Sequence, residues 1–289
     1  MQAPRLIRYL QSSLWALGAI VAVALGCNDQ SFAAPRQRID AQAIHARQPQ
    51  LLKETLAKIK PTARDRPQLY FVGVAGFGSQ AVFMREVRAV RELFDRRFGT
   101  LGRSIALINH ESTLHDVPLA TIVNLEHVLL HLGQRVMDAD RDTLFLFMTS
   151  HGEAGELAIQ MPRIALAQLT PVRLKLMLDR SGIRNRVIVI SACHSGSFIS
   201  ALADAHTLVM TAARADRSSF GCEDQRRWTY FGDAYFNRAL REESSFTRAF
   251  ANAKRTIRLW EAAERLKPSL PQIAGGEALG PALAAVGHD

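Results

Sequence analysis

Two short segments of the chain combine residue types that can carry out nucleophilic chemistry. Thr-Ser-His-Gly at 149–152 follows an apolar run at 144–147, and Ser-Ala-Cys-His-Ser-Gly at 191–196 follows an apolar run at 187–190. A thiol with an imidazole in reach is a pair of nucleophile and base. We therefore take the thiol of Cys193 and the imidazole of His151 as the candidate reactive groups.

The apolar runs indicate how these two side chains are positioned. Runs without polar alternation are typical of strands buried on both faces, as in parallel sheets covered by helices. Ligands and chemistry gather outside the carboxyl ends of such strands, and neighbouring strands lie about 4.8 Å apart. His151, leaving one strand, and Cys193, leaving the next, are therefore expected to meet at one edge of the sheet.

Gly152 and the residues after Cys193 add to this pattern. Because Gly152 has no side chain, its backbone N–H can come close to a substrate carbonyl, and together with the N–H of Cys193 it can form an oxyanion hole. Cys193 also precedes Ser-Gly-Ser at 195–197, which can open a helix whose N-terminus favours a thiolate. From spacing alone, a buried structural cysteine and a loop histidine stay open as the alternative.

The rest of the chain alternates the patterns of strands and helices. Apolar runs predict strands at 69–75, 104–109, 143–149, 186–192 and 207–211. Amphipathic or capped stretches predict helices at 82–98, 121–132, 233–243 and 245–266, and a further helix from Thr170-Pro171 to about 181–182. This alternation predicts an α/β fold with a layered sheet.

The first 33 residues have the layout of an export signal. Basic residues precede an uncharged, mainly apolar stretch at 14–26, which is short for a membrane span. Small residues before Ala34 suit cleavage there, whereas Ala-Leu-Gly-Cys at 24–27 resembles a bacterial lipobox in which Cys27 is lipidated. Both routes predict an exported, periplasmic protein, the second as a membrane-anchored lipoprotein. An uncleaved anchor is the remaining alternative.

The remaining segments are assigned by composition. Residues 34–67 hold a helical pattern and a linker, residues 68–273 hold the layered core, and the Gly-, Ala- and Pro-rich residues 274–289 are expected to be a flexible tail. The formal net charge is +9, but Lys and Arg are scattered and no basic tract is interleaved with aromatic residues. We therefore expect no nucleic-acid partner.

Several other polar groups are judged not to be reactive sites. The Gly-rich loop at 76–81 lacks the acidic residue that a dinucleotide site needs after the second strand. His194 is expected to face away from Cys193, because successive residues of a strand point to opposite sides. No metal template fits His110-Glu111 with His115-Asp116, or His127 with His131. We expect neither a metal nor a cofactor.

Besides Cys27, the chain has only Cys193 and Cys222. The two can pair in an oxidising compartment. A free Cys193 is favoured, because nothing else in the sequence resembles a disulfide framework.

Four blocks of residues resemble the legumain family of cysteine peptidases. They lie at 149–152 (Thr-Ser-His-Gly), at 191–197 (Ser-Ala-Cys-His-Ser-Gly-Ser), at 211–222 and at 229–233 (Thr-Tyr-Phe-Gly-Asp). Their order and spacing are similar to the legumain core, and the resemblance covers about residues 68–273.

This resemblance implies a caspase-like three-layer sandwich with a mostly parallel central sheet. It implies a cysteine endopeptidase that acts on a peptide or protein through a thioester acyl-enzyme. His151 would be the general acid and base, Cys193 the nucleophile, and the amides of Gly152 and Cys193 the oxyanion hole. The family's His and Cys act as a dyad without the tight hydrogen bond of a serine triad. Ser218 and Asp233 fall where legumains line the pocket for the residue before the scissile bond.

The chain also departs from the legumain pattern around that pocket. Legumains place an Asn and then an Arg after the first strand, where this chain has Ala-Val-Phe at 81–83. Legumains have an acidic residue two positions before the nucleophile, where this chain has Ser191. With Asp233 retained and the arginine gone, we expect the pocket to accept a basic or polar side chain rather than to require Asn.

These features together predict an exported cysteine endopeptidase. Two alternatives stay open. One is a transamidase or transpeptidase, in which an amine replaces water in resolving the acyl-enzyme formed by the same dyad. The other is a catalytically silent binding protein on the same fold.

Overall fold

A six-stranded sheet forms the core of the computed structural model, which describes residues 40–63 and 66–286. The order across the sheet is β2-β1-β3-β6-β7-β8, and all pairs are parallel except β7 with β8. The strands are β1 Leu69–Ala75, β2 Ser104–Ile108, β3 Thr143–Thr149, β6 Asn185–Ser191, β7 Thr207–Thr211 and β8 Gln272–Ala274. The carboxyl ends of β1, β3 and β6 therefore lie side by side at one edge.

Every residue of β1, β3 and β6 is buried, which confirms that the apolar runs are strands covered on both faces. Successive residues feed two different cores, as the period of a strand requires. Phe71, Phe145 and Phe147 pack into one core, and Leu144 and Leu146 pack into the other.

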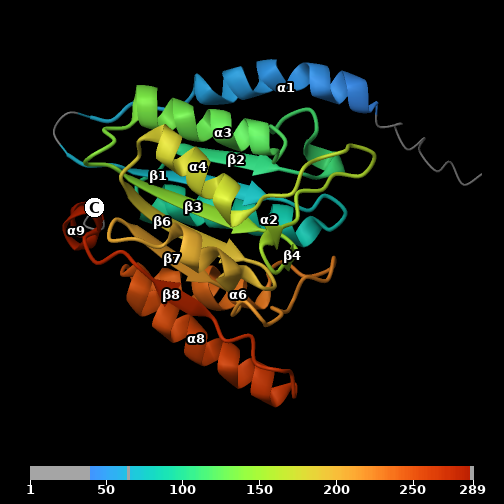
Figure 1. The fold of residues 1–289 in the computed structure, drawn as a ribbon, viewed down its shortest axis with the longest axis vertical. Helices are drawn as coiled ribbons and strands as arrows, with labels where there is room; N and C mark the ends of the chain where they lie inside the picture. Colours follow the sequence, from blue (N-terminus) through green and yellow to red (C-terminus); the bar gives the residue numbers. More distant parts are fainter. Residues whose placement is uncertain (1–39, 64–65, 287–289) are drawn as a thin grey trace, which may run out of the picture. The chain divides into compact units, whose positions relative to one another are not determined.

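Helices cover both faces of the sheet. On one face lie α2 (Ala81–Arg97), α6 (Tyr230–Gly232), its continuation through a π-helical stretch (Asp233–Ala239) into α7 (Leu240–Glu242), and α8 (Phe246–Ala263). On the other lie α3 (Ile122–His131), α4 (Pro171–Ser181) and α5 (Ile199–Leu202). The predicted α/β fold with a mostly parallel sheet between helices is confirmed (Figure 1).

Helix α1 (Ala41–Leu56) lies along α3 on the outer side of the second layer (Figure 1). The buried Gln48 fixes it there, because its Oε1 accepts from the backbone N–H of Leu119 at 2.8 Å and from Nδ2 of Asn124 at 3.1 Å. The described residues group into one compact unit. The helix predicted within 34–67 thus belongs with the core rather than to a separate segment.

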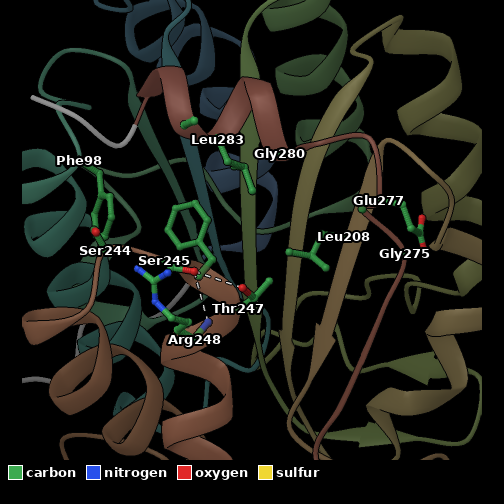
Figure 2. A pocket seen from close by; sticks show the side chains of 13 residues that line it. Phe98, Leu208, Ser244, Ser245, Thr247, Arg248, Gly275, Glu277, Gly280 and Leu283 are labelled. Atoms are coloured by element: carbon green, nitrogen blue, oxygen red, sulfur yellow. Dashed lines mark hydrogen bonds between the residues drawn. The ribbon is translucent and has the colours of Figure 1, made fainter.

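The prediction of a flexible tail over 274–289 is wrong for the described part of that segment. Ala274 closes strand β8, Leu279 is fully buried in the core, and α9 follows at Gly280–Val286. Leu283 of α9 and Phe246 of α8 help to line a cavity of about 500 Å³ under this segment (Figure 2). The composition of this segment, rich in small residues, did not indicate the short strand and the helix that it forms.

The signal segment at 1–33 and Cys27 lie outside the described residues. Among the helices that the structure describes, none has both the length and the apolar character needed to cross a membrane.

Candidate active site

The His151 imidazole is held at the carboxyl end of β3, two residues after the strand ends. It is half-buried, with the rings of Phe77 and Phe83 edge-on to it at centroid distances of 4.5 and 5.3 Å. This apolar enclosure lowers the pKa of His151 below its ordinary value of 6.5, because burial disfavours the charged imidazolium. The imidazole is therefore neutral near pH 7 and can act as a base.

Gln80 fixes which nitrogen of His151 is basic. Its Oε1 lies 2.5 Å from Nε2 of the imidazole. An amide oxygen can only accept, so Nε2 carries the proton and Nδ1 keeps the free lone pair. The neutral imidazole thus presents Nδ1 to a proton donor, with its ring orientation set by Gln80.

The sequence does not identify Gln80 as a site residue, because the departure from the legumain pattern lies at residues 81–83. Gln80 occupies the N-cap position of α2, yet its side chain makes no capping hydrogen bond. Gln is also absent from the residue types that cap helices well. A Gln at a cap position, directly after a Gly-rich loop, is the signal that could have singled it out.

The Cys193 thiol lies two residues beyond the end of β6 and is half-buried. Its Sγ accepts a hydrogen bond from the backbone N–H of Ser219 at 3.2 Å and lies 3.6 Å from the carbonyl oxygen of the same residue. Among the described residues, no hydrogen bond joins this thiol to the imidazole of His151. The two side chains are separately oriented, by Ser219 and by Gln80.

Gly152 brings the two strand ends into backbone contact. A Cβ at Gly152 would lie 2.4 Å from the carbonyl oxygen of Cys193, closer than any real Cβ contact. Gly152 opens β4 (Gly152–Glu153), which pairs with β5 (Glu156–Leu157) in a small hairpin. Only glycine allows the chain leaving β3 to pass this close to Cys193.

Glycine in the loop at 76–78 also allows two backbone segments to pass close to each other. A Cβ at Gly76 would lie 2.4 Å from the carbonyl oxygen of Ala158. The backbone of Gly76 accepts from the N–H of Gln160 at 2.8 Å. The loop that carries Phe77 and Gln80 is thereby joined to the segment after His151.

The side chains of His194 and Ser195 bond to backbone carbonyl groups rather than to the thiol, and His194 does not lie in a strand as its prediction assumed. The strand ends at Ser191, so His194 lies in a turn, with a left-handed φ of 55° and Nδ1 at 2.9 Å from the carbonyl oxygen of Ala215. Ser195 is buried and donates to the carbonyl oxygen of Ala192 at 2.8 Å. Neither side chain serves Cys193.

The three residues expected to contact substrate have different surroundings. Ser218 is exposed, directly before the residue that contacts the thiol. Asp233 is half-buried, accepts from Nδ2 of Asn237 at 2.6 Å and pairs with Arg238 at 3.4 Å. Ser191 is only 2% exposed and bonds to the hydroxyl of Thr229 at 3.1 Å. Ser191 is therefore buried beneath the active site and is not exposed to a bound substrate.

Among the described residues, no group of three or more His, Cys, Asp or Glu side chains is arranged to hold a metal ion. The site consists of a thiol, a neutral imidazole, an orienting amide and a glycine-permitted backbone contact at one edge of a parallel sheet. Such a constellation is typical of a cysteine-type hydrolase.

Comparisons with known proteins agree with this class. The model of the Peptidase C13 family matches residues 124–279, which is more than half of the chain. The chain belongs to this family, the legumain family, and is a cysteine-type peptidase. Among solved structures it is similar to caspase-1 from Spodoptera frugiperda, with 16% identity over 75% of this chain and 92% of that chain and a TM-score of 0.49. No curated protein matches the chain.

Proposed function

We propose that the chain is an endopeptidase that cleaves peptide bonds through a covalent thioester on Cys193. The observation that carries this proposal is the neutral imidazole of His151, fixed by Gln80 on the segment that packs against Cys193. Nδ1 of His151 takes the thiol proton as Sγ adds to the substrate carbonyl carbon. The amides of Gly152 and Cys193 are the proposed donors to the oxyanion.

The second half of the reaction uses the same imidazole. The imidazolium gives its proton to the departing amine, and the C–N bond breaks to leave a thioester on Cys193. His151 then takes a proton from water, whose oxygen attacks the thioester carbonyl. The thiol leaves and is reprotonated, and the peptide acid is released.

The test compares the wild type with Cys193→Ala and His151→Ala on fluorogenic peptides that carry each of the twenty residues before the scissile bond. We expect both variants to lose activity by at least about a thousandfold, because each removes a group that acts as part of one unit. Wild-type-like cleavage by Cys193→Ala would overturn the proposal.

We further propose that the pocket before the scissile bond accepts a basic or polar side chain. The half-buried carboxylate of Asp233 is the pocket group that can pair with a basic side chain. The only cation paired with Asp233 among the described residues is Arg238, which is largely exposed, so the pair is weak. The same peptide set tests this proposal, and strict cleavage after Asn would contradict it.

We also propose that residues 1–33 direct export. The support is the basic, then apolar, then small-residue pattern of the segment. The test is the mature N-terminus of the full chain after expression in a bacterium, read by mass spectrometry. A start at Ala34 or a lipidated Cys27 supports export by one route or the other, whereas an intact Met1 in the cytoplasm contradicts it.

A further inference from the structure

One buried carboxylate near the site is used by none of the steps above. Glu86 lies on the inner face of α2 with none of its surface exposed. Its Oε2 accepts from the hydroxyl of Thr149 at 2.6 Å. Its Oε1 accepts from the backbone N–H of Thr229 at 3.0 Å and from the hydroxyl of Thr229 at 2.8 Å. The carboxylate thus joins β3 to the loop before α6.

The network continues to the strand that carries the thiol. The Thr229 hydroxyl donates its proton to Glu86, so Ser191 must be the donor in the 3.1 Å contact between the Ser191 and Thr229 hydroxyls. Thr149 stands two residues before His151, and Ser191 stands two residues before Cys193. Glu86 is therefore linked to the ends of both strands that lead into the active site.

The backbone of Gly232 packs closely against Glu86. A Cβ at Gly232 would lie 1.8 Å from Oε1 of Glu86. The N–H of Gly232 donates to the Thr229 hydroxyl at 2.9 Å, so that hydroxyl donates once and accepts twice. All partners in the network are neutral groups, so the carboxylate is stabilised by hydrogen bonds rather than by an ion pair.

We propose that Glu86 is a positioning residue of the peptidase, which fixes the ends of β3 and β6 so that the imidazole of His151 and the thiol of Cys193 keep their relative placement. This inference rests on the proposed function of those two side chains. Small displacements of reacting groups are costly, since a shift of about 1 Å can cost a hundredfold in rate.

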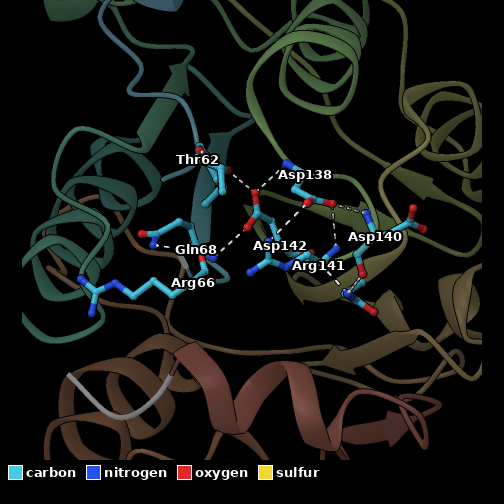
Figure 3. A network of polar contacts seen from close by, with 9 residues as sticks. Thr62, Arg66, Gln68, Asp138, Asp140, Arg141 and Asp142 are labelled. Atoms are coloured by element: carbon cyan, nitrogen blue, oxygen red, sulfur yellow. Dashed lines mark hydrogen bonds and ion pairs between the residues drawn. The ribbon is translucent and has the colours of Figure 1, made fainter. Parts of the chain in front are cut away.

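The chain offers a matched control at the other end of the same strand. Asp142 directly precedes β3, and its carboxylate accepts from the backbone N–H of Gln68 at 2.8 Å, from that of Asp138 at 2.7 Å and from the hydroxyl of Thr62 (Figure 3). It has three donors like Glu86, but it lies at the amino end of β3, away from His151. A purely structural role predicts the same consequences for both carboxylates.

The experiment compares Glu86→Ala, Glu86→Gln and Thr149→Val with Asp142→Asn in the full chain. For each, we measure kcat, KM, the free energy of unfolding in denaturant, and the alkylation rates of Cys193 and Cys222 by iodoacetamide, resolved by peptide mass spectrometry. We expect kcat to fall about tenfold or more in Glu86→Ala, and severalfold in Thr149→Val, with KM within about threefold of the wild type. Glu86→Gln, which keeps the shape and most hydrogen bonds, should recover most of this loss.

Asp142→Asn should lose stability while its kcat stays within about twofold of the wild type. The inference is overturned if Thr149→Val and Glu86→Ala keep the wild-type kcat, or if Asp142→Asn loses kcat to the same extent at equal stability. Should Glu86→Ala fail to fold, Thr149→Val decides, with Asp142→Asn as its control.

Alkylation separates this inference from the proposed function. If the wild type cleaves no peptide, the proposed function fails. The positioning role is then judged by whether the alkylation rate of Cys193 falls in the Glu86 and Thr149 variants while that of Cys222 does not. Unchanged Cys193 rates overturn it.

Discussion

At the scale of single residues, the site depends on groups that hold His151 from outside its own segment. The imidazole gains its basic nitrogen from Gln80, and it gains its neutrality from the aromatic enclosure that lowers its pKa. Neither effect requires contact with the thiol. A dyad of this kind is assembled by separate supports for each partner.

Gln80→Ala tests the support of the imidazole. Without the amide oxygen, the ring loses its fixed tautomer and orientation, so we expect kcat to fall roughly tenfold with little change in KM. Steady-state kinetics measures this. Ser79→Ala, at the exposed neighbouring position, is the control and should behave as the wild type. Equal kcat values for the two variants would rule out an orienting role for Gln80.

Gly152→Ala tests the backbone contact between the strand ends. The new Cβ would meet the Cys193 carbonyl oxygen, so the segment after β3 must move, and we expect kcat/KM to fall about a hundredfold. Gly155→Ala in the same hairpin is the control. Gly155 has a φ of 85° but open space around it, so this variant should lose about 1 kcal/mol of stability with unchanged kcat. Comparable kinetic losses in both variants would count against the contact.

At the scale of elements, sequence patterns predict the sheet and its helices. They do not predict the residues that orient the catalytic side chains. The apolar runs predicted the observed bounds of β1, β3 and β7, and those of β6 to within a residue, because the middle of a strand buried on both faces is mostly apolar. Glu86, Gln80 and Ser219 act across the fold, and spacing along the chain does not report such contacts. One signal existed for Glu86, since it lies on the apolar stripe of α2, three residues after the buried Phe83.

The prediction of a flexible C-terminal tail was wrong because the contacts that order this segment are also distant in the sequence. Strand β8 has three residues and pairs only at the edge of the sheet, so it leaves almost no pattern. The burial of Leu279 depends on α8 and β7, which the local sequence does not reveal.

Leu279→Ala tests whether this segment is part of the folded core. Because Leu279 is fully buried, we expect the free energy of unfolding to fall by about 2–4 kcal/mol, with kcat unchanged. Denaturant unfolding measures this. Leu270→Ala, where the side chain is 36% exposed, should cost much less. A flexible tail would give no loss of stability at Leu279.

At the scale of the whole molecule, buried carboxylates make the stability of this basic protein depend on pH. Burial raises the pKa of Glu86 from 4.5 to about 6, and burial also raises the pKa of Asp142. A group that holds its proton more tightly in the folded state than in the unfolded chain contributes most to stability in acid. The contribution of Glu86 is therefore complete below pH 4.5 and is lost as the pH rises through about 6.

Glu86→Gln isolates this contribution, because the other titrating groups are common to both proteins. The free energy of unfolding of the wild type, relative to that of Glu86→Gln, should fall by about 2 kcal/mol between about pH 4 and about pH 7.5. Denaturant unfolding at a series of pH values measures the difference. A difference independent of pH would mean that Glu86 has the same pKa in the folded and unfolded states.

Catalysis by this site requires that the His151 imidazole activate the Cys193 thiol. The most direct test is the rate at which iodoacetamide alkylates each cysteine near pH 7 in the wild type and in His151→Ala. Burial raises the pKa of Cys222 and slows its reaction. We predict that Cys193 reacts at least about tenfold faster than Cys222, and that His151→Ala removes most of this advantage. Equal rates at the two cysteines in the wild type would contradict the account.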